Sequence, residues 1–168
     1  MTTPNPPHIR YAASEAQLYI AFDGHATHRA SLTAEALFGA FLASAPAQPI
    51  AIFDLDACTW VDSTFAGWMI KTRQQLSRAG GRVVLSRCTP TCRGALQTMG
   101  LSQLFEFRDV GLPPGMEQVP CPEEGADRAT VEFMLEAHQR LADLSPENQR
   151  VFARIAAELR RVLESTNS

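Results

Sequence analysis

The sequence contains no run of about 20 consecutive apolar residues, the length that a membrane-spanning helix requires. Its first residues, Met-Thr-Thr-Pro-Asn-Pro-Pro, have neither an early basic cluster nor an apolar core, so they do not resemble a secretory signal peptide. With only 4 cysteines in 168 residues, the chain does not have the composition of a small disulfide-stabilised domain, and we expect free thiols. These absences predict a cytoplasmic protein without direct membrane insertion.

The sequence also lacks the usual signatures of an enzyme or a metalloprotein. It has no glycine-rich phosphate-binding loop, no paired carboxylates in an active-site pattern, and no histidine at a recognised motif distance from Ser63. No spacing of cysteines and histidines completes a metal site. We therefore expect no catalytic residues, no metal and no cofactor.

Charge is unevenly distributed along the chain. The net charge is −3, yet residues 63–105 contain six basic side chains and no acidic ones. This cationic band could face an acidic partner or lipid headgroups, or it could lie against the chain's own acidic groups. Nucleic acid is the weakest of these interpretations, because the pI is below neutral and basic residues do not interleave with aromatic ones. We expect no nucleic-acid partner.

Hydrophobic periodicity predicts strands and helices that alternate after an initial hairpin. This order is typical of an α/β sandwich in which crossover helices cover a mixed central sheet, here of about four to five strands. The predicted strands cover 9–13, 17–22, 50–55, 82–86 and 104–107, and the predicted helices begin near Ser31, Ser63 and Pro90.

The most informative segment runs from a buried strand into a helix at Asp62-Ser63-Thr64. Asp62 or Ser63 could cap this helix, and such residues are favoured at helix starts for capping alone. The amides of a helix start also favour negative charge, so a hydroxyl there suits a phosphate, whether bound or covalently attached. The residues alone leave both interpretations open.

The motifs from Asp54 to Phe107 resemble the STAS domain, a family named for sulfate transporters and anti-sigma factor antagonists. Phe22-Asp23-Gly24 also resembles the turn after the family's second strand. The resemblance covers residues 9–110 and implies a STAS-like sandwich. The matching motifs follow one another without a gap: Asp54-Leu55, Trp60-Val61-Asp62-Ser63-Thr64, Gly67, Ala79-Gly80-Gly81, Arg82-Val-Val-Leu85, Pro90, Met99-Gly100-Leu101 and Leu104-Phe105.

In regulatory members of that family, the second hydroxyl of this motif is phosphorylated by a kinase that doubles as an anti-sigma factor. By position, the resemblance implies Thr64 as the phosphoacceptor, with Ser63 beside it. It implies a bacterial anti-sigma factor antagonist that sequesters the kinase when unphosphorylated and is reset by a protein phosphatase. The alternative is a structural STAS subunit, without phosphorylation, of a signalling assembly or of lipid or anion transport machinery.

The resemblance further implies a partner-binding surface around the start of the helix at Ser63. Where the family usually has Gly-Leu after the paired hydroxyls, this chain has Phe65-Ala66. Phe65 either changes how a partner docks or fills core volume lost at Ala66. The residues that we expect at this surface are Asp23, Gly24, Asp54, Asp62, Ser63, Thr64, Phe65, Gly67 and Lys71.

Four segments are predicted: a flexible N-terminus at 1–8, the STAS domain at 9–110, a linker at 111–127 and a helical hairpin at 128–165. Two amphipathic helices cannot bury both apolar faces alone. The hairpin should therefore pack on the STAS body, on a second copy to form a homodimer, or on another protein. We interpret His138, on its apolar face, as a packed core residue.

Overall fold

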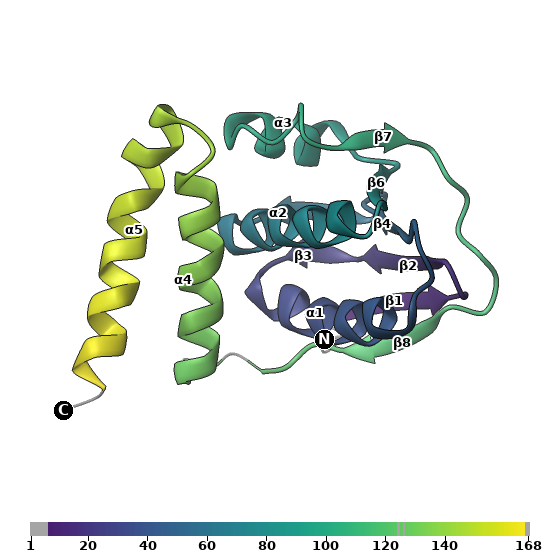
Figure 1. Cartoon of the computed structure of the whole chain (residues 1–168), viewed down its shortest axis with the longest axis horizontal. Coiled ribbons are helices and arrows are strands. Elements are labelled where there is room, and N and C mark those ends of the chain that lie inside the picture. Colours follow the sequence, from purple (N-terminus) through teal and green to yellow (C-terminus); the bar gives the residue numbers. More distant parts are fainter. Residues whose placement is uncertain (1–6, 124, 126, 167–168) are drawn as a thin grey trace, which may run out of the picture.

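A computed structural model describes residues 7–123, 125 and 127–166 of the chain. Of the segment 1–8 that we expected to be flexible, residues 1–6 lie outside this description, whereas His8 begins the first strand. The described chain forms a six-stranded mixed sheet, a separate two-stranded sheet and five helices (Figure 1). The predicted α/β class with a mixed sheet is confirmed.

The main sheet consists of β1 (His8–Ala13), β2 (Gln17–Phe22), β4 (Ile50–Asp54), β6 (Arg82–Ser86), β7 (Glu106–Arg108) and β8 (Glu117–Pro120). Their order across the sheet is β7-β6-β4-β2-β1-β8. β1 and β2 form the predicted antiparallel hairpin, and β4, β6 and β7 continue from β2 in parallel. β8 pairs antiparallel with β1. It lies inside the segment 111–127 that we expected to be a linker, and it raises the number of strands to six.

A small sheet that the sequence did not predict pairs β3 (Gly24–Ala26) with β5 (Cys58–Val61) in parallel. Gly24 has a φ of 79°, a left-handed conformation that glycine adopts without strain, and its N–H donates to the Ala57 carbonyl at 2.8 Å. Strands of three and four residues are too short for a periodic signal. Each of them leads the chain into a helix.

The helices are α1 (His28–Ser44), α2 (Ser63–Arg78), α3 (Pro90–Thr98), α4 (Arg128–Ala142) and α5 (Pro146–Ser165). α1 begins three residues before Ser31 because Thr27 caps it; its hydroxyl accepts the Arg29 N–H at 3.3 Å. α2 and α3 begin at the predicted residues, Ser63 and Pro90. α1 and α2 cover one face of the main sheet (Figure 1).

Aromatic side chains hold the first two turns of α2 on the sheet. Phe65 meets Phe22 edge to face, with ring centroids 4.7 Å apart, and Trp68 stacks on Phe53 at 5.2 Å. Such contacts add roughly 0.5–1.5 kcal/mol each beyond the burial of apolar area. The start of α2 is therefore a rigid part of the core.

α4 and α5 form the predicted hairpin and stand at one end of the body, with α4 lying between α2 and α5 (Figure 1). All residues of α2 from 64 to 70 are buried, because the sheet covers one side of these turns and α4 packs against another. The outward face of α5 remains apolar and exposed. Val151, Ile155 and Val162 on it are 56%, 40% and 47% exposed.

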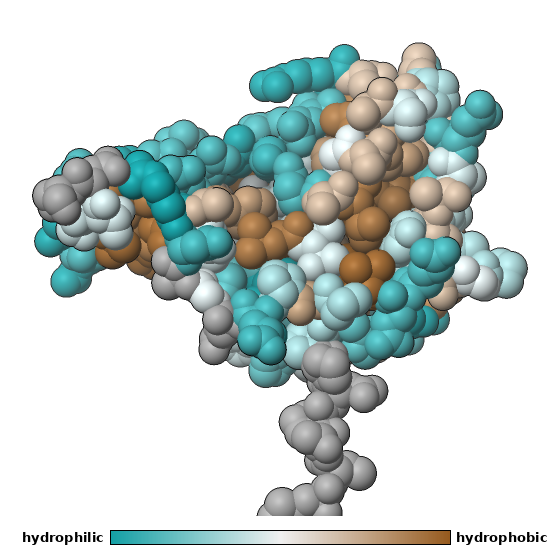
Figure 2. All heavy atoms as spheres, turned by 90° about the horizontal axis from the view of Figure 1, so that it is seen from below, coloured by the Kyte–Doolittle hydropathy of each residue, from teal (hydrophilic) through white to brown (hydrophobic). Residues whose placement is uncertain are grey.

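Figure 2 shows apolar atoms gathered on the side of the molecule that is seen from below. A groove of about 490 Å³ lies between α1 and the β1–β2 hairpin and is lined mainly by apolar side chains, among them Leu18, Leu37 and Phe41. Phe41 is near the end of α1, so most of the length of α1 separates this groove from Thr27. No described helix is long and apolar enough to cross a membrane.

Candidate functional site

The carboxylate of Asp62 connects the starts of α1 and α2. Its Oδ1 accepts the Phe65 N–H at 2.8 Å, and its Oδ2 accepts the His28 N–H at 3.2 Å. The N–H groups of a helix start carry partial positive charge, so one carboxylate serves two helix starts. Burial raises the pKa of Asp62, while the two N–H groups oppose that shift. Asp62 is the cap of α2, one of the two candidates that the sequence offered.

Ser63 lies beside this carboxylate and contacts the C-terminal hairpin. Its Oγ is 2.8 Å from His138 Nε2, and His138 Nδ1 is 2.7 Å from the Met134 carbonyl oxygen. Because a carbonyl only accepts, Nδ1 carries a proton, and in the neutral imidazole Nε2 accepts the Ser63 hydroxyl. His138 is buried, as expected for a core residue, but it also binds the first hydroxyl of the motif.

Gly67 marks the closest approach of α2 to α4. A Cβ at this position would lie 2.2 Å from the Ala137 carbonyl oxygen and 2.6 Å from its Cα. No side chain fits at that distance, so only glycine permits this crossing. The glycine that belongs to the family motif here makes room for the backbone of the hairpin.

Thr64 and Phe65 do not reach the surface. Thr64 is 2% exposed and Phe65 is 0% exposed. Phe65 packs against Phe22 and Trp68 in the core. Of the two roles that the sequence allowed, changing how a partner docks or filling core volume, its position fits the second.

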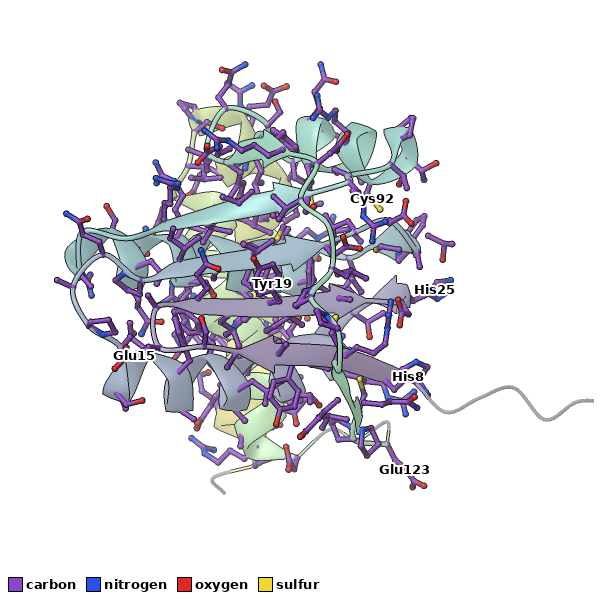
Figure 3. All side chains as sticks on the ribbon, turned by 90° about the vertical axis from the view of Figure 1, so that its right-hand side faces the viewer. His8, Glu15, Tyr19, His25, Cys92 and Glu123 are labelled. Atoms are coloured by element: carbon purple, nitrogen blue, oxygen red, sulfur yellow. The ribbon has the colours of Figure 1, made fainter. Side chains whose placement is uncertain are left out.

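Asp23 and Gly24 line a cavity of about 700 Å³ together with Asp62. Arg10 donates twice to the Asp23 carboxylate, at 2.8 and 2.9 Å. Three histidines also line this cavity; one of them, His28, is the first residue of α1. The other two, His8 and His25, lie at the same end of the sheet, opposite Glu15 (Figure 3).

Asp54 and Lys71 are held by partners within the chain. The buried carboxylate of Asp54 accepts Arg87 Nε at 2.8 Å. Lys71 Nζ lies 2.6 Å from Glu35 of α1. Neither residue lines the cavity beside Asp62.

Most of the cationic band lies against the chain's own groups, which was one of the three interpretations. Besides Lys71 and Arg87, Arg82 pairs with Glu106 at 3.2 Å. The guanidinium of Arg93 stacks over the Phe107 ring at 4.0 Å, and Arg73 donates to the Leu104 carbonyl at 2.6 Å. Arg78 is exposed at the end of α2.

The four cysteines are free thiols, as predicted. Cys92, in the first turn of α3 (Figure 3), is buried and contacts buried Cys58. A hydrogen bond with Cys58 lowers the pKa of Cys92 to about 6, against the opposing effect of burial, and the same contact raises the pKa of Cys58. Among the described residues, no group of histidine, cysteine and carboxylate side chains could hold a metal ion.

Two residues at this end of the molecule were missed from the sequence. His138 lies 75 positions from Ser63, and no spacing rule connects them. Trp60, on β5, is 57% exposed. The sequence feature that could have identified it is a tryptophan two residues before Asp62, next to Thr59. Tryptophan is enriched among the residues that dominate binding in protein interfaces.

The model of the STAS domain family matches residues 27–110. The matched region extends from the cap of α1 past β7 and includes Asp62, Ser63 and Thr64. It ends before α4, so the hairpin lies outside the match. No curated protein matches the chain significantly.

Several solved structures share the fold, including the three that follow. The anti-sigma factor antagonist SpoIIAA in its unphosphorylated form is 19% identical, with 59% of this chain and 86% of that chain covered and a TM-score of 0.52. An anti-sigma factor antagonist from Mycobacterium paratuberculosis is 20% identical, with 66% and 92% covered and a TM-score of 0.52. A putative one from Thermotoga maritima is 16% identical, with 61% and 86% covered and a TM-score of 0.51. At these identities the likeness establishes the fold alone, a STAS-like sandwich.

Proposed function

Because the chain belongs to the STAS domain family, we propose that it is a phosphorylation-regulated protein-binding module of the anti-sigma factor antagonist type. Unmodified, it holds an anti-sigma factor serine/threonine kinase; phosphorylated at Thr64, it releases the kinase until a protein phosphatase restores it. One observation carries this proposal. Two helix starts meet at Asp62, directly beside Ser63 and Thr64.

The expected consequence of phosphorylation is a change in binding with little change in fold. A phosphate adds about 1.5–2 negative charges, and a charge in the first helical turn gains only about 0.3–1 kcal/mol from the helix. Asp62 already occupies the N–H groups there, so the phosphate also meets a like charge. Charge repulsion at a fitted interface costs several kcal/mol, and this larger effect decides the outcome.

Phosphosite mass spectrometry on protein recovered from its native host tests the proposal. We expect a phosphate on Thr64 that varies with growth state. A Thr64→Glu variant should keep the secondary structure of wild type by circular dichroism, at a lower free energy of unfolding because Thr64 is 2% exposed, and should lose affinity for the kinase. Ser63 and Thr64 that stay unmodified under all growth states contradict the switch.

A second candidate is a structural STAS subunit that docks its partner without phosphorylation, in a signalling assembly or in lipid or anion transport machinery. The burial of Thr64 and the hydrogen bond of Ser63 to His138 favour it, because neither hydroxyl is freely presented. Genes beside the coding sequence distinguish the two: an ATPase-type kinase and a sigma factor for the first, transporter genes for the second.

A homodimer through the hairpin is part of the same proposal. The exposed residues Val151, Ile155 and Val162 follow one another along the outward face of α5 at helical spacing. Sedimentation of wild type and of Ile155→Glu tests this face. A wild-type dimer that becomes monomeric in the variant supports it, and a wild-type monomer at high concentration contradicts it.

We assign no catalytic activity to the chain and place it in the cytoplasm with its partners. In this proposal the kinase and the phosphatase perform all the chemistry. Hydrolysis of ATP or GTP by the purified protein alone would contradict it.

A further inference from the structure

α4 covers the start of α2. The shape and polarity of this contact indicate which other segments can bind to the same surface. We propose that this surface, formed around Ser63 and Gly67, is a docking site for a helix, that α4 occupies it, and that a partner presenting an amphipathic helix displaces α4. The use of the site by a regulatory partner rests on the function proposed above. The site itself rests on the contacts of α4.

The shape of the surface around Gly67 favours a helix with a small residue. The 2.2 Å between the Cβ position of Gly67 and the Ala137 carbonyl oxygen means that α4 approaches the α2 backbone directly. Only a helix with a small residue at the crossing can approach so closely, because a larger side chain would push the two axes apart. Ala137 is that small residue in α4, and a competing helix needs alanine, glycine or serine at the same place.

The contact between α2 and α4 also includes a polar pair. The buried pair at the surface is a hydrogen bond between Ser63 and His138 rather than an apolar contact. Ser63 is half-buried, so water or a partner side chain can replace His138 when α4 leaves. The net free energy of such an exchange is small, because one hydrogen bond substitutes for another. A partner helix therefore needs a polar side chain directly after its small residue, as His138 follows Ala137 in α4.

The hairpin contacts the core cluster through few fully buried side chains. Among its buried apolar residues, only Leu141, Ala142 and Phe152 belong to the main core cluster, and all three lie near the turn between α4 and α5. At the same end, Asn148 donates to the Met99 carbonyl at 2.8 Å. The fully buried contacts of the hairpin with the core cluster thus lie near its turn; farther along α4, Phe133 packs against the cluster while only partly buried, and Ala137 and Val131 are buried outside it.

α5 gives the hairpin no second attachment of comparable extent. It buries only three of its residues and turns an exposed apolar face outward. Elements with few contacts to the core open locally, at a lower free energy than global unfolding. The hairpin has the character of such a unit.

Occupation by α4 has a direct consequence for Thr64. This side chain is 2% exposed, and its neighbours Ser63 and Gly67 are in contact with the hairpin. A kinase cannot reach the hydroxyl in this arrangement. Displacement of α4 removes the segment that contacts Ser63 and Gly67 on either side of Thr64.

Native-state hydrogen exchange on the full chain tests whether the hairpin opens by itself. We expect amides of residues 128–165 to exchange at least tenfold faster than those of β4 and β6 in the absence of denaturant. Equal exchange rates in the hairpin and the central strands would overturn the proposal, since the hairpin would then be a fixed part of the body.

Two matched glycine substitutions locate the contact. Gly67→Ala places a methyl group against the Ala137 backbone, whereas a Cβ at Gly39, also inside a helix, meets nothing within 4 Å. Gly67→Ala should accelerate exchange in 128–165 at least tenfold without accelerating it in β4 and β6; Gly39→Ala should accelerate exchange in neither. Equal effects of Gly67→Ala on hairpin and strands would contradict a separable contact.

A peptide in trans tests the helix site directly. The probe is a fluorescein-labelled peptide of residues 127–144, measured by anisotropy against the full chain. Asn148→Ala removes the anchor to Met99 and leaves the α2 surface intact, so it should raise peptide affinity at least tenfold, because more molecules have the site free. Exposed Gln149 supplies the control, Gln149→Ala, which should behave as wild type.

A double variant and the oligomeric state of Asn148→Ala test where the peptide binds and what occupies the site. Gly67→Ala combined with Asn148→Ala should abolish peptide binding; persistent binding would place the peptide elsewhere and overturn the site. A dimer of Asn148→Ala that persists when Ile155→Glu removes the α5 contact, seen by sedimentation, would mean that a second copy's hairpin is the preferred occupant and would overturn displacement by a foreign partner. None of these measurements involves a kinase, so Thr64 could prove to be unmodified in cells while the helix site stands.

Discussion

The indole of Trp68 donates its Nε1–H to Glu35 at 2.6 Å, and this hydrogen bond joins α2 to α1. The other oxygen of the same carboxylate accepts Lys71 Nζ at 2.6 Å. Trp68 is almost completely buried, so its N–H depends on this single acceptor. Glu35 therefore fixes the rotation of the helix that carries Ser63 and Thr64.

Replacement of Glu35 should separate the two roles of its carboxylate. Glu35→Leu leaves the buried indole N–H without an acceptor and should lower the free energy of unfolding by about 1–3 kcal/mol. Glu35→Gln keeps an acceptor for Trp68 and loses only the partly exposed ion pair with Lys71, so it should cost no more than about 1 kcal/mol. Urea unfolding followed by tryptophan fluorescence measures both. Equal losses in the two variants would show that the indole hydrogen bond is not the main contribution.

Ser63→Ala should destabilise the protein through His138. The variant leaves buried Nε2 without a donor, at a cost of about 1–2 kcal/mol. The control is Ser77→Ala on the exposed side of the same helix, which should change stability by less than about 0.5 kcal/mol. A double-mutant cycle with His138→Ala measures the coupling directly. Additive effects of Ser63→Ala and His138→Ala would show that the two side chains do not interact in solution.

Asp62 should make stability depend on pH. Its pKa is raised in the folded chain by burial, so the unfolded chain loses this proton first as pH rises above about 4. The folded state therefore loses stability between that pH and the raised pKa. Thermal unfolding of wild type and Asp62→Asn from pH 4 to 7 measures this. Relative to the variant, wild type should become less stable across the window; a constant difference would contradict the raised pKa.

Cys92 should titrate near neutral pH only while Cys58 is present. The hydrogen bond with Cys58 lowers the pKa of Cys92 to about 6, and Cys58→Ala removes that stabilisation of the thiolate while burial continues to disfavour it. The ultraviolet absorbance of the thiolate should thus show a transition around pH 6 in wild type that moves to higher pH in the variant. Cys121→Ala, which alters a separate buried thiol, should leave the transition in place.

The central architecture was predictable because each element carries its own signal. β4 is a near-continuous apolar run, so its burial on both faces could be predicted directly. The short apolar alternation of β1 and β2 identified both as strands, although the last three residues of β2 are all buried. α2 shows its core stripe through Phe65, Met69 and Leu76, all of them buried. These patterns arise within single elements and need no knowledge of the rest of the chain.

What could not be predicted depends on contacts between distant segments. Gly67, Trp68 and Ile70 fall partly outside the apolar stripe of α2 and are buried all the same, because α1 and α4 cover the sides that the stripe leaves open. β8 has no apolar alternation; backbone pairing along β1, rather than side-chain burial, makes it a strand. For the same reason the sequence placed a linker there and gave no hint that His138 lies against Ser63.

β8 also sets how strongly α4 competes for its own site. Its pairing with β1 fixes the chain at Pro120, and α4 begins at Arg128, so the connection between them is seven residues long. Such a connection spans at most about 25 Å and keeps a displaced helix within reach of α2. Short tethers correspond to effective concentrations in the millimolar range. A protein that binds this surface from solution therefore competes with α4, whose effective concentration at the site does not fall when the protein is diluted.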